Sequence, residues 1–175
     1  MTKRLEGRIA LVTGAAQGMG RAISVGLAEE GARVVGFDIA AMDQTALEIE
    51  QLGGIFLGYA VDVCDEQRVY ESVNTAALAA GGVDILVNNA GIYPFSGLEG
   101  IDSALWHRMM NLNLHAPFYM CMAALPHLKE SGSGRIINMA SNAPWLVAGG
   151  MAVYIASKMG LIGWTRGLAT EVADF

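Results

Sequence analysis

Residues 13–20, Thr-Gly-Ala-Ala-Gln-Gly-Met-Gly (TGAAQGMG), are the stretch that decides the fold of this 175-residue chain. They follow a β-branched and apolar run at residues 8–13 and precede a helical pattern at residues 19–30, which Gly31 closes. Glycines in such a turn let backbone N–H groups approach a pyrophosphate closely, and the N-terminus of the following helix favours its negative charge. The strand, glycine turn and helix therefore predict a site for a nucleotide.

The alternation of strands and helices continues along the chain. Nearly continuous apolar runs predict a parallel sheet that is covered by helices on both faces, and we expect one doubly wound α/β domain over residues 1–175. Further strands are predicted at residues 32–38, 55–61, 83–87 and 135–139, and further helices at residues 43–52, 65–80 and 153–172.

A longer helical stretch begins near Asp102 and passes Met120, and Pro117 and Pro126 predict that it bends or breaks. A glycine-containing loop is expected from Ser141 to Gly150, before the last helix.

The composition argues against several classes of partner. The formal net charge is −6, so nucleic acids and acidic membranes are poor partners for this surface. The two cysteines are far apart and match no metal-binding spacing, which favours a metal-free protein in a reduced, cytoplasmic setting. The N-terminus has no unbroken apolar stretch before the glycines, so neither a signal peptide nor a membrane span is predicted there.

Asp38 ends the second predicted strand. In a dinucleotide-binding fold, a carboxylate at this place can accept hydrogen bonds from the adenosine ribose and would repel the 2′-phosphate of NADP. Residues 39–41 (Ile-Ala-Ala) offer no arginine for a phosphate, although Arg21 and Arg33 could reach in from elsewhere. The sequence thus favours NAD, with a capping or turn aspartate as the alternative. Asp62, just past the third strand, could lie near the adenine amino group or simply cap the next helix.

Tyr154 and Lys158 are four residues apart, about one turn, so a helix here places the phenol and the ammonium on one face. A nearby cation favours the ionised form of a phenol, which makes the pair a candidate acid and base. Ser141 precedes them and could hold a carbonyl or alcohol oxygen beside the phenol. The alternative is a chance pairing on a helix surface.

Together these motifs resemble the short-chain dehydrogenase/reductase family over essentially the whole chain. The matching segments are TGAAQGMG (13–20), Asp62-Val63, NNAG (88–91), the region of Asn113, Ser141, and YxxxK (154–158). The resemblance implies a Rossmann-like fold, a doubly wound parallel sheet in three α/β/α layers, and an NAD-dependent oxidoreductase that acts on CH–OH groups without a metal.

The resemblance also implies roles for single residues. Tyr154 would be the general acid in reduction and the base in oxidation, while Lys158 would assist it and hold the nicotinamide ribose. Ser141 would position the substrate oxygen. Asn113, chosen over Asn111, would be the structural and proton-relay asparagine. The residues expected to bind the cofactor are Gly14, Gln17, Gly18, Met19, Gly20, Asp38, Asp62, Val63, Asn89, Ala90, Gly91, Tyr154 and Lys158. Asn88 would instead brace the sheet.

The side chains expected around the substrate are mostly apolar or aromatic, which favours an apolar or aromatic secondary alcohol or ketone over a sugar. Mutual packing of these side chains is the alternative. In detail, the chain is similar to bacterial members that oxidise aryl-alkyl alcohols such as phenylethanol, with sugar-alcohol and pyridoxal dehydrogenases as alternatives. The expected lining residues are Tyr93, Pro94, Phe95, Asn142, Trp145, Leu146 and Val147.

Family members are usually longer, so the resemblance implies that the last strands and the loop covering the substrate are absent, which would leave the fifth strand as an open edge. Two hypotheses follow: a working alcohol dehydrogenase, or a truncated, catalytically weak nucleotide-binding protein that acts in assembly. The resemblance implies a homodimer or homotetramer through the helical stretch at 102–124 and the last helix.

Overall fold

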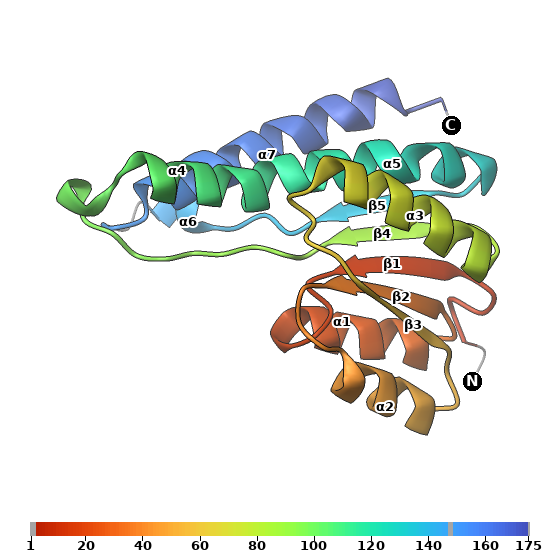
Figure 1. The fold of residues 1–175 in the computed structure, drawn as a ribbon. Helices are drawn as coiled ribbons and strands as arrows, with labels where there is room; N and C mark the ends of the chain where they lie inside the picture. The colour runs from red at the N-terminus through yellow and green to blue at the C-terminus, as the bar shows by residue number, and fades with distance from the viewer. Residues whose placement is uncertain (1–2, 147–148, 175) are drawn as a thin grey trace.

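The computed structural model describes residues 3–146 and 149–174, and its centre is a five-stranded parallel sheet of order β3-β2-β1-β4-β5 (Figure 1). This confirms the predicted Rossmann-like α/β sheet. Helices connect each strand to the next one along the chain, as a sheet of parallel strands requires. The strands are β1 (Ile9–Thr13), β2 (Arg33–Asp38), β3 (Phe56–Ala60), β4 (Ile85–Asn88) and β5 (Arg135–Asn138).

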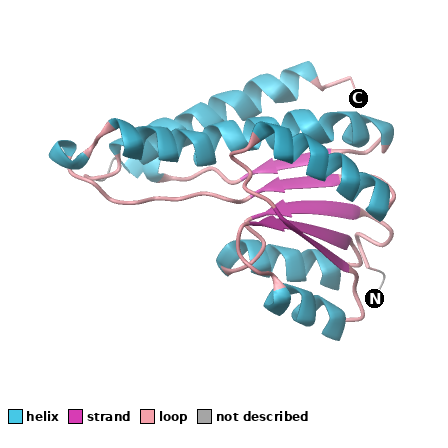
Figure 2. Cartoon of the chain, viewed as in Figure 1, coloured by secondary structure: helices cyan, strands magenta, loops and turns pink. Residues whose placement is uncertain are grey.

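Helices cover both faces of the sheet, which gives the predicted three layers (Figures 1 and 2). One face packs against α1 (Gly18–Glu29) and α2 (Asp43–Gln51). The other packs against α3 (Glu66–Ala80), α5 (Ala116–Glu130) and α7 (Ala152–Glu171).

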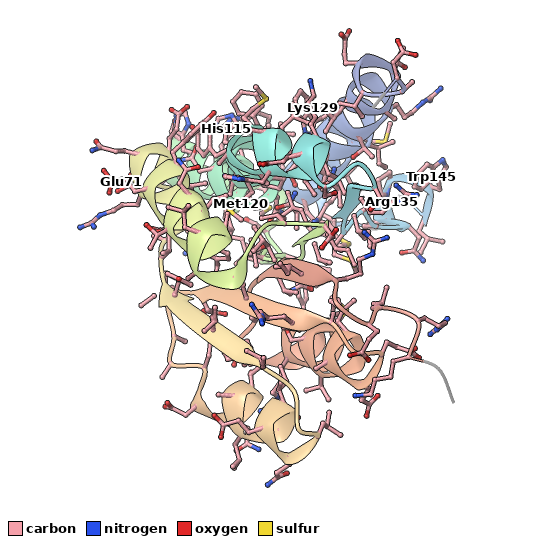
Figure 3. All side chains as sticks on the ribbon, turned by 90° about the vertical axis from the view of Figure 1, so that its right-hand side faces the viewer. Glu71, His115, Met120, Lys129, Arg135 and Trp145 are labelled. Atoms are coloured by element: carbon pink, nitrogen blue, oxygen red, sulfur yellow. The ribbon has the colours of Figure 1, made fainter. Side chains whose placement is uncertain are left out.

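The buried core is divided between the two faces of the sheet. In β1, Ala10 and Val12 belong to the cluster under α1 and α2, whereas Leu11 belongs to the cluster under α3 and α5. Figure 3 shows Met120 of α5, which is almost fully buried in the second cluster, and Arg135 of β5, which is exposed at the sheet edge. Because both faces are covered, the strands need apolar side chains at nearly every position, as the sequence indicated.

The long helical stretch is interrupted once. It consists of α4 (Ser103–Met110), a π-helical turn, η2 (Asn111–His115), and then α5. Pro117 is the second residue of α5 and directly follows the π turn, whereas Pro126 lies inside α5 without ending it. The predicted interruption is therefore found just before Pro117, and the break expected at Pro126 is wrong.

The loops contain two short helices that the sequence did not indicate. These are the 3₁₀ helix η1 (Leu98–Gly100) and α6 (Ala143–Leu146), which occupies part of the expected glycine-containing loop. Both are too short to carry a periodic apolar pattern. Val147, one of the expected substrate-lining residues, lies outside the described residues.

β5 is the last strand of the described chain and forms an edge of the sheet. Its side chains are partly exposed, and a groove of about 260 Å³ lies beside it between α5 and α7. No helix in the described ranges is both long and apolar enough to cross a membrane.

Candidate functional site

The glycine turn lies where β1 ends and α1 begins, at the carboxyl edge of the sheet. Gly14 and Gly18 have positive φ angles of 68° and 55°, a conformation that other residues rarely adopt. At Gly20, a Cβ atom would lie 1.9 Å from the carbonyl oxygen of Gly14, so no side chain fits between α1 and the turn. Gln17 is the N-cap residue of α1, and Met19 is largely exposed. The turn thus presents backbone, not side chains, to a ligand.

Thr13 joins this turn to the NNAG segment, and sequence reasoning missed it. Its buried hydroxyl accepts hydrogen bonds from the backbone N–H groups of Asn89 and Ala90, both at 3.0 Å. The Asn89 side chain donates in return to the Thr13 carbonyl oxygen at 3.0 Å. The opposite side-chain atom, Asn89 Oδ1, is buried and has no hydrogen-bond partner in the structure. A signal was present in the sequence, since the threonine is the first residue of the glycine-rich segment.

Asp38 is held beside the glycine turn. Its carboxylate accepts hydrogen bonds from the N–H groups of Ala16 (2.9 Å) and Ala40 (3.0 Å). It is therefore a turn aspartate, yet a carboxylate has about four acceptor sites, so it can still accept from a ribose. Arg33 donates to the carbonyl oxygen of Ala80, and Arg21 faces Glu48 at 3.8 Å. Each of these arginines thus has a partner of its own, away from Asp38.

Asp62 does not cap a helix, contrary to the alternative weighed for it. Its Oδ1 accepts from the backbone N–H of Cys64 at 2.9 Å, while Asp65 is the N-cap of α3 and accepts from Arg68 N. Burial, with the nearby Asp62 carboxylate, raises the pKa of the Cys64 thiol to about 12. The Cys64 thiol therefore stays protonated near neutral pH. Val63, the residue before it, is buried in the core.

Asn113 lies in the π turn η2 and is fully buried, whereas Asn111 is exposed. Asn113 Oδ1 accepts from the N–H of Ile92 at 2.9 Å, and its amide donates to Ile92 O at 2.8 Å and to Ser157 Oγ at 3.1 Å. Ser157 in turn donates to the carbonyl oxygen of Tyr154 at 2.7 Å. Ser157 was also missed by sequence reasoning, because a serine inside a helix carries no distinctive pattern.

Lys158 approaches Tyr154 as the four-residue spacing predicted. Its Nζ lies 5.8 Å from the centroid of the Tyr154 ring and donates to Met139 O at 2.7 Å. Burial lowers the pKa of Lys158. The folded chain therefore binds this proton less tightly than the unfolded chain does. The ammonium form consequently reduces stability below the folded-state pKa, and this cost is relieved as the pH rises through it.

Ser141 lies between β5 and α6. Its Oγ accepts from the N–H of Ala143 at 3.1 Å, which leaves its own proton to be donated. Asn88 braces the sheet as expected, because its amide donates to Asn138 Oδ1 on β5 at 2.8 Å.

The residues expected around the substrate come from two adjacent loops, which are joined by a hydrogen bond from Ser96 N to Gly150 O at 3.0 Å. The Tyr93 ring meets the Tyr154 ring edge-on, with centroids 6.3 Å apart. Trp145 lies at the outer surface (Figure 3). Of the expected residues that the structure describes, Tyr93, Phe95, Asn142, Trp145 and Leu146 are exposed and Pro94 is half-buried.

The two halves of the site meet at Gly91. A Cβ atom there would lie 3.0 Å from Asn113 Oδ1 and 3.7 Å from Lys158 Nζ. Asn113 and Lys158 therefore lie directly beside the NNAG segment, which is hydrogen-bonded through Thr13 to the glycine turn. Across the described ranges, no three His, Cys, Asp or Glu side chains come together as a metal site.

Comparison with known proteins agrees with this geometry. A family model described as short chain dehydrogenase matches residues 8–175. The D-threitol dehydrogenase of Mycolicibacterium smegmatis is 39% identical over 171 residues, which cover 96% of this chain and 65% of that protein.

Solved structures are also similar. The carveol dehydrogenase of Mycobacterium avium in complex with NAD has a TM-score of 0.93 and 30% identity, over 98% of this chain and 68% of that one. A short chain dehydrogenase of Burkholderia cenocepacia in complex with NADP has a TM-score of 0.92 and 38% identity, over 97% of this chain and 70% of that one. The chain thus spans about two thirds of the length of the proteins it matches.

Proposed function

Because the chain belongs to the short chain dehydrogenase family, we propose that it is an NAD-dependent oxidoreductase that interconverts a secondary alcohol and a ketone. The observation that carries the proposal is the meeting at Gly91, where the glycine turn and the NNAG segment reach Asn113 and Lys158. Residues 1–175 would act as one nucleotide-binding domain.

The fit of a dinucleotide is supported by backbone and side chains of this chain. At the N-terminus of α1, where a pyrophosphate would bind, a Cβ on Gly18 would meet no atom within 4 Å, and Asp38 keeps acceptor capacity for a ribose. The buried Asn89 Oδ1 has no partner and could accept a hydrogen bond from the bound cofactor. When bound, the nicotinamide supplies or accepts the hydride.

The protein's own part in the reaction is to move one proton and hold one oxygen. The Tyr154 hydroxyl would donate its proton to the carbonyl oxygen in reduction and take it back in oxidation. Lys158, which donates to Met139 O and lies 5.8 Å from the centroid of the Tyr154 ring, would hold the nicotinamide ribose. Ser141 would donate a hydrogen bond to the substrate oxygen, and Asn113 fixes the backbone at Ile92 and, through Ser157, at Tyr154.

The direct test is NAD reduction by a panel of secondary alcohols that includes 1-phenylethanol and threitol. NAD-dependent oxidation of at least one of them supports the proposal. Binding of NAD with no turnover of any alcohol would instead favour the second hypothesis, a catalytically weak nucleotide-binding protein that acts in assembly.

The substrate is proposed to be apolar or aromatic. Tyr93, which meets the Tyr154 ring, and Phe95 on the same loop present exposed apolar surface, as do Trp145 and Leu146 on α6. Such side chains suit an aryl or alkyl group better than a polyol. In the panel, a kcat/KM for 1-phenylethanol above that for threitol is the expected order.

NAD is proposed over NADP because of the charge of Asp38. Asp38→Asn keeps the shape of the side chain and removes the charge that repels a 2′-phosphate, so the affinity for NADP relative to NAD should rise about 10-fold, or about 1.4 kcal/mol. Binding of NADH and NADPH, followed by fluorescence, measures this ratio.

The control is Asp43→Asn, which makes the same substitution at an exposed carboxylate at the start of α2, whereas Asp38 is half-buried. It should leave the ratio unchanged. A wild-type chain that already prefers NADP would refute the cofactor assignment.

A homodimer or homotetramer is proposed to form through the helices on the α5 side of the sheet. Trp106 on α4 and Phe118 on α5 are 42% and 38% exposed, which is more than such large apolar side chains usually are in a core. Light scattering on the purified chain should give two or four times the 18.5 kDa chain mass. A monomer at micromolar concentration would contradict this assembly.

A further inference from the structure

The catalytic helix α7 is attached to the end of β5 by two hydrogen bonds that lie two helical turns apart. The first joins Lys158 Nζ to Met139 O at 2.7 Å, within the site. The second joins Asn138 Nδ2 to Thr165 Oγ1 at 2.9 Å, outside the site. Residues seven apart lie on nearly the same helix face. Asn138, the last residue of β5, and Met139, which follows it, thus contact one face of α7 at points two turns apart.

The side chain of Asn138 is itself fixed by a hydrogen bond to the neighbouring strand β4. It is the register partner of Asn88 on β4, and its Oδ1 accepts from Asn88 Nδ2 at 2.8 Å. Asn88 is only 3% exposed, and its backbone oxygen also accepts from the N–H of Met139 at 3.0 Å. The polar series Asn88, Asn138 and Thr165 therefore runs from the buried middle of the sheet to α7.

The apolar contacts of α7 would not fix its axial position as sharply. Leu161 and Leu168 are buried on the same side, and such contacts gain energy from area with little directional preference. A hydrogen bond between a strand and a helix, by contrast, is lengthened and turned away from its preferred angle when the helix slides along its axis. Thr165 also donates to Leu161 O at 2.7 Å, which fixes the rotamer that accepts from Asn138.

We propose that Asn138 and Thr165 are positioning residues, which set the axial position of α7 and thereby present Tyr154 and Lys158 to the cofactor and the substrate. The role rests on the proposed oxidoreductase function. Thr165 lies 11 residues, about three turns, after Tyr154, and it acts only through the helix.

Thr165→Val tests the proposal, because valine has the shape of threonine without the hydroxyl. A misplacement of about 1 Å can cost about 10²-fold in rate, so partial misplacement should lower kcat about 10-fold while KM for the alcohol changes little. Thr165→Ser keeps a hydroxyl and should restore kcat to near the wild-type value. If the valine variant does not fold, Thr165→Ala removes the same hydroxyl with a better helix former.

Thr170→Val is the matched control. Thr170 lies on the same helix and donates to the carbonyl four residues earlier, as Thr165 does, but it is exposed. It should leave kcat unchanged, so any loss that is specific to Thr165 reports the contact with Asn138.

A second readout does not depend on turnover. The chain has three lysines, so the ¹³Cε NMR signal of Lys158 can be assigned by elimination with single substitutions of the other two. This signal should move in Thr165→Val and return in Thr165→Ser. Wild-type kcat and an unmoved Lys158 signal in the valine variant would overturn the proposal. If the wild type is inactive but the Lys158 signal still moves in Thr165→Val and returns in Thr165→Ser, the oxidoreductase function is refuted. The positioning of Lys158 by Thr165 would then still be supported.

Discussion

Tyr154→Phe is expected to lower NAD-dependent alcohol oxidation by at least about 10²-fold, since a positioned acid or base contributes about 10²–10⁴-fold. The phenylalanine ring keeps the edge contact with Tyr93 and the place beside the Lys158 ammonium. Only the hydroxyl that exchanges a proton with the substrate is lost. Affinity for NAD should therefore remain close to that of the wild type, and calorimetric titration with NAD measures it independently of turnover.

Tyr70→Phe provides the control for this substitution. Tyr70 lies on α3, on the outer side of the molecule, and its hydroxyl takes no part in the proposed site. The control should keep full activity. If Tyr154→Phe retained more than a few per cent of the wild-type turnover, another group would have to supply the proton and the assignment of Tyr154 would fail.

Gly20→Ala is expected to abolish detectable NAD binding and to destabilise the chain. The new Cβ would lie 1.9 Å from Gly14 O and 2.6 Å from Asn89 Nδ2, far inside van der Waals contact. Because the obstructing atoms belong to the backbone and to a side chain that is tied to Thr13, α1 must move away from the glycine turn. Overpacking of this kind typically costs about 1–3 kcal/mol. Thermal unfolding and NAD titration measure the two effects.

Gly26→Ala is a sensitive control, because Gly26 lies on the same helix and a Cβ there would meet no atom within 4 Å outside the helix backbone. It should stabilise the chain by about 0.5–1 kcal/mol, since alanine is the better helix former. Normal NAD binding by Gly20→Ala would show that the close packing of α1 against the turn is not required for the site.

Much of the fold could be predicted, because local patterns and tertiary packing agree there. The strands buried on both faces are continuously apolar, and glycines mark the turn before α1 and the end of α3. The π turn η2 could not be foreseen. It is stabilised by the contacts of Asn113 with Ile92, which are distant in sequence and leave no local pattern. Pro126 predicted a break that does not occur, because a local helix-breaking signal is overridden in the folded chain, where α5 continues through this proline.

The site was predicted unevenly. Tyr154, Lys158 and Asn113 were predicted from spacing and resemblance, and the structure places Asn113 and Lys158 beside Gly91 and Lys158 beside the Tyr154 ring, while their roles stay predictions. Thr13 and Ser157 were missed because a small hydroxyl residue becomes informative only when its hydrogen-bond partners are known. Asp62 was predicted to lie near an adenine, and this stays a prediction.

The number of residues in the π turn also sets how α4 and α5 are rotated relative to each other. One residue corresponds to about 100° of rotation around an α-helix. The turn at residues 111–115 lies between two helices that each bury a face, with Met109 buried on α4 and Met120 buried on α5. Loss of a single residue there would leave a regular helix, but one whose two ends could no longer both face their partners. In this stretch of the chain, the number of residues is therefore constrained as strongly as their identity.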